Sequence, residues 1–114
     1  MLAPGLVLDP HRVIDLEVQR CGEASGLLAA RLTDAFDAAR SIAAEIDGEG
    51  CIVFSVRGGE ALRAGATALV RSLALEWADR RIRVNAVCGA PPPELIAFIA
   101  SPAGRMLTGA VLDG

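Results

Sequence analysis

Few side chains in this sequence could act as nucleophiles, bases or metal ligands. It has one histidine, His11, and neither tyrosine nor lysine. The three cysteines are Cys21, Cys51 and Cys88, and no two of them form a C-x-x-C pair. This spacing argues against a zinc site, and unpaired thiols are typical of a reduced cytosolic compartment. Ser55 as a nucleophile needs a neighbouring base, and His11 is distant in the sequence.

The composition is that of an apolar, mildly acidic globular chain. Its 114 residues are 53% hydrophobic and 22% charged, with a net charge of -3. One domain of this length buries roughly two thirds of its unfolded surface, and the apolar surplus favours oligomers. Without a basic run, we expect neither nucleic acid nor an anionic membrane as a partner. The segment MLAPGLVLDP is too short for a signal peptide or membrane span, so we expect a cytoplasmic protein.

Hydrophobic periodicity predicts alternating strands and helices along most of the chain. Continuous apolar runs are typical of strands that are buried on both faces of a parallel sheet. Residues 1–26 are the least readable part, with possible strands at 5–8 and 13–18 and a turn at 22–26. The order of elements predicts βαβ units with right-handed crossovers. The predicted helices are 27–46, 61–78 and 94–100, and the other predicted strands are 51–56, 82–87 and 107–112.

The predicted helix at 61–78 is apolar on every face. Leu69 and Leu73 belong to one face, and Val70 and Ala74 belong to another. A helix of this kind needs cover on more than one side. A sheet covers only one side, so the pattern predicts a second helix or a second subunit against this helix.

Four segments of the chain together resemble a known family. They are LTDAFDAAR at 32–40, GCIV at 50–53, ALVRSLALE with IRVNAV at 68–87, and FIAS with LTGAVLDG at 98–114. In this order they resemble the C-terminal half of the short-chain dehydrogenase/reductase family. The resemblance implies one truncated Rossmann-like domain over residues 1–114. It implies an α/β three-layer sandwich, with a mostly parallel sheet of about four or five strands and helices on both faces.

The family's catalytic pair does not match at the start of the long helix. Members use Tyr-x-x-x-Lys, in which Tyr is the general acid/base and Lys lowers its pKa and holds the nicotinamide ribose. Counted back from Glu76, the Lys position falls on Arg63 and the Tyr position on Gly59. Glycine has no proton to give, and arginine keeps its charge without deprotonating.

The two supporting catalytic positions are also replaced. The family's polarising Ser aligns with Val56 or Arg57, and alternation places the nearby Ser55 on the other side of the strand. The supporting Asn aligns with Arg31. With the Ser position taken as 57, the four positions that align with the family's catalytic residues are Arg31, Arg57, Gly59 and Arg63. None of them has the family's residue.

The family's cofactor motif is missing as well. Members hold NAD(P) with a T-G-x-x-x-G-x-G turn after the first strand, and the glycines at 22 and 26 do not match that spacing. We therefore expect no cofactor, and NAD(P) only if the chain is a divergent oxidoreductase. Asn85, in the I-R-V-N strand, is expected to be structural.

These observations favour a non-catalytic subunit that acts through oligomer contacts. In the family, the long helix and the helix before it form the main subunit contact. The partner would be a second copy or a full-length short-chain dehydrogenase/reductase. The residues predicted for this interface are Phe36, Leu62, Ala66, Leu69, Leu73 and Trp77.

Three other functions are compatible with the sequence. The chain could be a divergent oxidoreductase or a degraded gene fragment that folds only as an oligomer. It could also be a small-molecule-binding module, since open parallel sheets bind ligands at the carboxyl ends of their strands. That crevice would lie around Arg57, Arg63 and Gly89.

Overall fold

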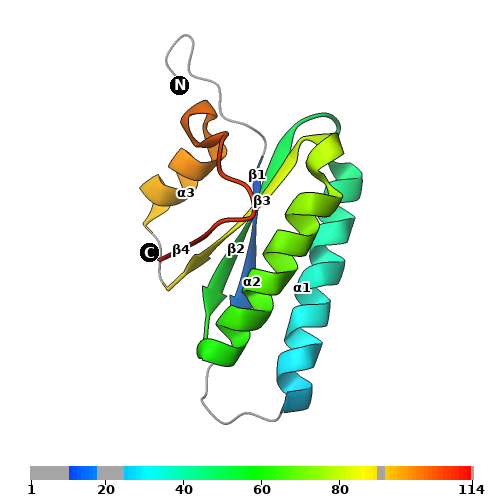
Figure 1. Ribbon diagram of the computed structural model, residues 1–114, viewed down its shortest axis with the longest axis vertical. Coiled ribbons are helices and arrows are strands. Elements are labelled where there is room, and N and C mark those ends of the chain that lie inside the picture. The colour runs from blue at the N-terminus through cyan, green and yellow to red at the C-terminus, as the bar shows by residue number, and fades with distance from the viewer. Residues whose placement is uncertain (1–10, 18–24, 90–91, 114) are drawn as a thin grey trace.

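A computed structural model describes residues 11–17, 25–89 and 92–113 of the chain (Figure 1). Its four parallel strands form one sheet in the order β1-β2-β3-β4. The strands are β1 (His11–Glu17), β2 (Gly50–Arg57), β3 (Ile82–Cys88) and β4 (Val111–Asp113). The helices are α1 (Ser25–Glu45), α2 (Glu60–Glu76) and α3 (Pro93–Ala100), with short 3-10 helices η1 (Ala78–Arg80) and η2 (Pro102–Gly104).

The predicted fold class is confirmed. Helices α1 and α2 cover one face of the sheet and α3 covers the other, so the molecule has three layers (Figure 1). Alternate side chains of β2 enter the two cores: Phe54 packs in the core under α1 and α2, and Val53 packs in the core beneath α3. The two-sided burial predicted for the apolar strands is therefore present.

The ends of the chain differ most from the elements that the sequence predicts. The possible strand at 5–8 and most of the turn at 22–26 lie outside the described residues. The prediction of a last strand at 107–112 was wrong at its start, because strand pairing with β3 begins only at Val111 and continues to Asp113. Gly109 has a φ of +71°, in the left-handed region, which breaks an extended strand before residue 111.

Helix α2 is covered on two sides and open on a third. Val70 and Leu73 are fully buried toward the sheet. Gly65 meets α1, where a β-carbon would lie 2.6 Å from a methyl group of Leu32, so a larger residue would require the Leu32 side chain to shift. On the remaining side, Leu75 is 81% exposed. The predicted second helix against α2 is therefore α1, and an apolar strip is left uncovered.

Polar side chains of β3 hold the C-terminal segment against the sheet. Asn85 is fully buried, its amide nitrogen donates to the Leu107 carbonyl at 3.0 Å, and its amide oxygen accepts from the Ala110 N–H at 3.1 Å. Arg83 donates to the carbonyls of Ile99 and Gly104, both at 2.7 Å. The expected structural role of Asn85 is confirmed.

We predict that Asn85→Ala lowers the free energy of unfolding by about 2–4 kcal/mol, because it leaves two backbone groups without their partner in a buried place. Urea unfolding followed by circular dichroism measures this. The matched control is Ser101→Ala, which removes an exposed side-chain bond to the Phe98 carbonyl and should cost about 0.5 kcal/mol or less. Equal losses in the two variants would contradict the prediction.

Candidate functional site

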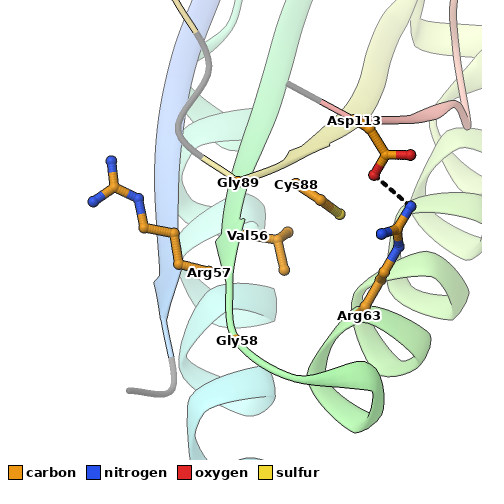
Figure 2. A pocket seen from close by; sticks show the side chains of 7 residues that line it. All are labelled: Val56, Arg57, Gly58, Arg63, Cys88, Gly89 and Asp113. Carbon is orange, nitrogen blue, oxygen red and sulfur yellow. Dashed lines mark ion pairs between the residues drawn. The ribbon is translucent and has the colours of Figure 1, made fainter. Parts of the chain in front are cut away.

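A cavity of about 500 Å³ lies where the carboxyl ends of β2, β3 and β4 meet the start of α2 (Figure 2). This is the edge at which open parallel sheets bind ligands. The residues that line it are Val56, Arg57, Gly58, Arg63, Cys88, Gly89 and Asp113.

The register of the sheet brings three of these side chains to one face. Val56 pairs with Cys88, and Cys88 pairs with Asp113, so all three point toward the layer that contains α2. Arg63 comes from the first turns of α2, and its Nη2 lies 2.6 Å from Oδ1 of Asp113 (Figure 2). The cavity thus contains an ion pair between α2 and the last strand.

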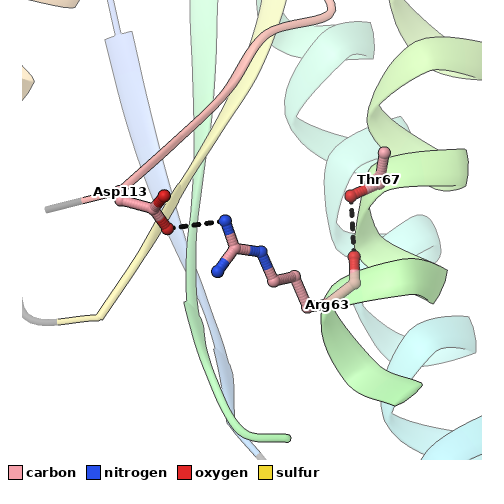
Figure 3. A network of polar contacts seen from close by, with 3 residues as sticks. All are labelled: Arg63, Thr67 and Asp113. Carbon is pink, nitrogen blue, oxygen red and sulfur yellow. Dashed lines mark hydrogen bonds and ion pairs between the residues drawn. The ribbon is translucent and has the colours of Figure 1, made fainter. Parts of the chain in front are cut away.

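The ion pair is exposed to solvent, so its contribution to the stability of the fold is small. The side chain of Arg63 is 47% exposed and that of Asp113 is 73% exposed. Pairs of this kind contribute about 1 kcal/mol or less. The Thr67 hydroxyl donates to the backbone carbonyl of Arg63 at 2.8 Å, one turn along the helix (Figure 3). The guanidinium is held toward β4 by Asp113.

Cys88 places its thiol on the wall of this cavity (Figure 2). Burial raises the pKa of the Cys88 thiol; the charge of Arg63 lowers it and the charge of Asp113 raises it. The net direction is upward, so the thiol is protonated at neutral pH. Because the thiolate is the nucleophile, Cys88 is a poor nucleophile as it stands.

Three of the four positions that the sequence predicted as degenerate catalytic positions lie at this edge. Arg57 is exposed, and its guanidinium extends away from Cys88 and Arg63 in Figure 2. Gly59 is the N-cap of α2, with a φ of -79° and nothing within 4 Å of the place of a β-carbon. A larger side chain would therefore fit at Gly59. Arg31 is exposed on α1 and is not among the described residues that line the cavity.

Two other observations bear on the sequence-based site. Ser55 is buried on the face of β2 opposite to Val56, as alternation predicted. Sequence reasoning included Arg57, Arg63 and Gly89 in the crevice but missed Cys88 and Asp113. Both end parallel strands, and that position was the signal that could have placed them at this edge.

The residues predicted for a subunit interface are mostly inside the chain. Leu62, Ala66, Leu73 and Trp77 are between 0% and 6% exposed and pack in the core beneath α1 and α2. Phe36 and Leu69 are half-buried at the junction of these helices. The four buried side chains have no surface to offer a partner, and the exposed apolar surface of α2 lies on its outer side instead.

Comparison with known proteins identifies the fold. No family model and no curated protein matches the sequence. Solved structures do match: BdcA (YjgI) from E. coli, with a TM-score of 0.66 and 22% identity, and a short chain dehydrogenase from Burkholderia cenocepacia J2315 in complex with NADP, with 0.67 and 21%. A hydroxysteroid dehydrogenase from Escherichia coli matches with 0.66 and 18%. The fold is that of the short-chain dehydrogenases.

The match covers most of this chain and part of each neighbour. It spans 91% of this chain in all three cases, and 59%, 63% and 62% of the respective neighbours. The resemblance found in the sequence is therefore confirmed at the level of fold. Across the described residues, no helix is both long and apolar enough to cross a bilayer, and no three Cys, His, Asp or Glu side chains group as metal ligands.

We predict that Arg63→Gln moves alkylation of Cys88 by iodoacetamide to higher pH. The positive charge of Arg63 lowers the pKa of the thiol, so its removal raises that pKa further. Asp113→Asn should move the profile to lower pH, because it removes a charge that raises the pKa. Mass spectrometry of the peptide containing Cys88 gives the rate at each pH. Arg71→Gln, at an exposed position on α2, is the control and should leave the profile unchanged.

Proposed function

We propose that this chain is a non-catalytic subunit with a short-chain dehydrogenase fold that acts through assembly. Its partner is a second copy or a full-length short-chain dehydrogenase/reductase. The contact is the outer side of α2. The observation that carries the proposal is the apolar strip on this helix.

The strip lies on the side of α2 that faces away from the sheet. Ala64, Ala68 and Leu75 recur at helical spacing on this side, and all three are exposed. Leu75 is 81% exposed, and the small alanines would let a second helix approach closely. Arg71 lies among them and supplies a polar group for the rim of a contact.

The chemistry at the strand-end cavity supports a role without turnover. The Tyr position is Gly59, which offers no proton, and the Lys position is Arg63, which is paired with Asp113. General acid catalysis needs a group whose pKa lies near the working pH. The Cys88 thiol, which also lines this cavity, has its pKa raised by burial.

We predict that Leu75→Glu lowers the native molecular mass of the assembly, because it replaces the largest exposed apolar side chain of the proposed contact with a charge. Multi-angle light scattering after size exclusion measures the mass. Met106→Glu is the matched control, since Met106 is 87% exposed and lies on the segment after η2, and it should leave the mass unchanged. A lower mass for Met106→Glu alone would contradict a contact through α2.

The same pair of variants identifies the partner in the source organism. A tagged wild-type chain should recover either itself or a dehydrogenase/reductase, and Leu75→Glu should lose that protein while Met106→Glu keeps it. Recovery of this chain alone would rule out the heteromer and leave the homo-oligomer.

A second candidate function is small-molecule binding in the strand-end cavity. Its support is the convergence of Arg63, Cys88 and Asp113 from three elements on one hollow. A guanidinium beside a carboxylate suits a ligand that has both a donor and an acceptor. A divergent oxidoreductase would use the same place for its nicotinamide.

We predict that titration with NADH and with NADPH gives no binding heat, because the positions that hold the nicotinamide ribose in the family are replaced here. Isothermal titration calorimetry on the folded wild-type chain makes the measurement. Dissociation constants in the micromolar range, weakened by Arg63→Gln but not by Arg71→Gln, would contradict the assembly-only proposal and favour the divergent oxidoreductase.

A further inference from the structure

A second hollow lies at the opposite edge of the sheet, where the strands begin. Its volume is about 290 Å³, and it is lined by Glu49, Arg81, Arg83 and Arg105. Glu49 precedes β2, Arg81 follows η1, Arg83 belongs to β3, and Arg105 follows η2. Three arginines, two from the start of β3 and one from the segment after η2, therefore line one hollow together with a carboxylate.

Two of the three arginines are held in place by the surrounding backbone. Arg83 is half-buried, and its Nη1 donates to the carbonyls of Ile99 and Gly104, so the side chain is fixed beside the hollow. The Arg81 carbonyl accepts from the N–H of Gly50 at 3.3 Å, which fixes Arg81 at the start of β2. Because the Arg83 side chain and the Arg81 backbone are ordered before any ligand arrives, binding would cost less conformational entropy, although the Arg81 side chain itself is 77% exposed.

Arg81 also has an unusual backbone. Its φ is +57°, and it is the one non-glycine residue with positive φ in the described part of the chain. The left-handed region is disfavoured for a residue with a β-carbon, and glycine or asparagine is the usual choice there. An arginine at this position points to a use for its side chain.

The charges around the hollow do not balance. Arg81 is paired with Glu49, with Nη1 and Oε1 3.3 Å apart, and both groups are exposed. Within the described residues, Arg105 makes no ion pair. Among the described residues that line the hollow, three guanidinium groups stand against one carboxylate, although the whole chain has a net charge of -3.

We propose that this hollow binds a small dianionic oxyanion, a phosphate group either free or on a small phosphate monoester. An anion is complementary to a hollow lined by more guanidinium than carboxylate groups, and guanidinium groups bind phosphate oxygens through paired, charge-assisted hydrogen bonds. The site is separate from the strand-end cavity and from the outer side of α2. It does not depend on the function proposed above.

Calorimetric titration of the full chain with inorganic phosphate tests this, at about pH 8, where phosphate is mostly dianionic. Chloride at equal ionic strength is the reference, because exposed charges are screened by salt. We expect one phosphate per chain and binding at least about tenfold weaker in Arg105→Gln, which loses a hydrogen bond between charged groups. Arg105 is exposed, so this variant should fold.

The controls separate the two edges of the sheet. Arg40→Gln, at an exposed position on α1, has the same change in charge as Arg105→Gln and should bind phosphate like the wild type. Arg63→Gln should also bind normally, since Arg63 lies at the other edge. Loss of binding in Arg63→Gln with retention in Arg105→Gln would overturn the proposal, as would equal losses in all three variants.

A gain of affinity provides a second test. Glu49→Gln removes the carboxylate that competes with the anion for Arg81, so phosphate should bind several-fold more tightly. Glu60→Gln, in the first turn of α2 at the other edge, makes the same change in net charge and should have no effect. Unchanged or weaker binding in Glu49→Gln, or the same gain in Glu60→Gln, would contradict a site at this place.

Discussion

The buried amide side chain of Asn85 on β3 needs hydrogen-bond partners, and this requirement determines where the C-terminal segment lies. Asn85 has no exposed surface, so its donor and acceptor both need partners within the chain. It finds them in Leu107 and Ala110, and this fixes the segment that leads into β4. Because β4 is then in register with β3, Asp113 lies beside Cys88 and within reach of Arg63. The candidate site therefore depends on a side chain outside it.

The two edges of the sheet have different chemistry for a simple geometric reason. At the carboxyl ends of the strands, the Arg63 guanidinium is paired with Asp113, and the Arg57 guanidinium extends away from this pair. At the amino ends, Arg83 leaves β3 toward the carbonyls around η2, which brings it near Arg81 and Arg105. The carboxyl ends of the strands are where open parallel sheets are expected to bind ligands. At the amino ends, the described residues that line the hollow are three arginines and one glutamate.

Periodicity predicted the elements well wherever a segment is buried on two faces. The runs at 51–56 and 82–87 agree with β2 and β3 to within one residue at each end. The closing strand was less accurate, because residues 107–110 are held by side-chain bonds from β3 and by the backbone of Gly109. In the site, Arg63 and Gly89 were found by analogy with open parallel sheets, and Cys88 and Asp113 were missed because their alignment depends on strand register.

By itself, the sequence determined the order of strands and helices and the Rossmann-like class, and it led to the prediction that Gly59 and Arg63 occupy the positions of the family's catalytic pair. These features depend on residue type and local spacing, which are properties of the chain. Only the tertiary structure decided which apolar side of α2 is buried, so that Leu73 belongs to the core and Leu75 to the surface. It also decided that Arg81 and Arg105 line one hollow. Spacing in the sequence tells which residues share a face, but packing decides what that face meets.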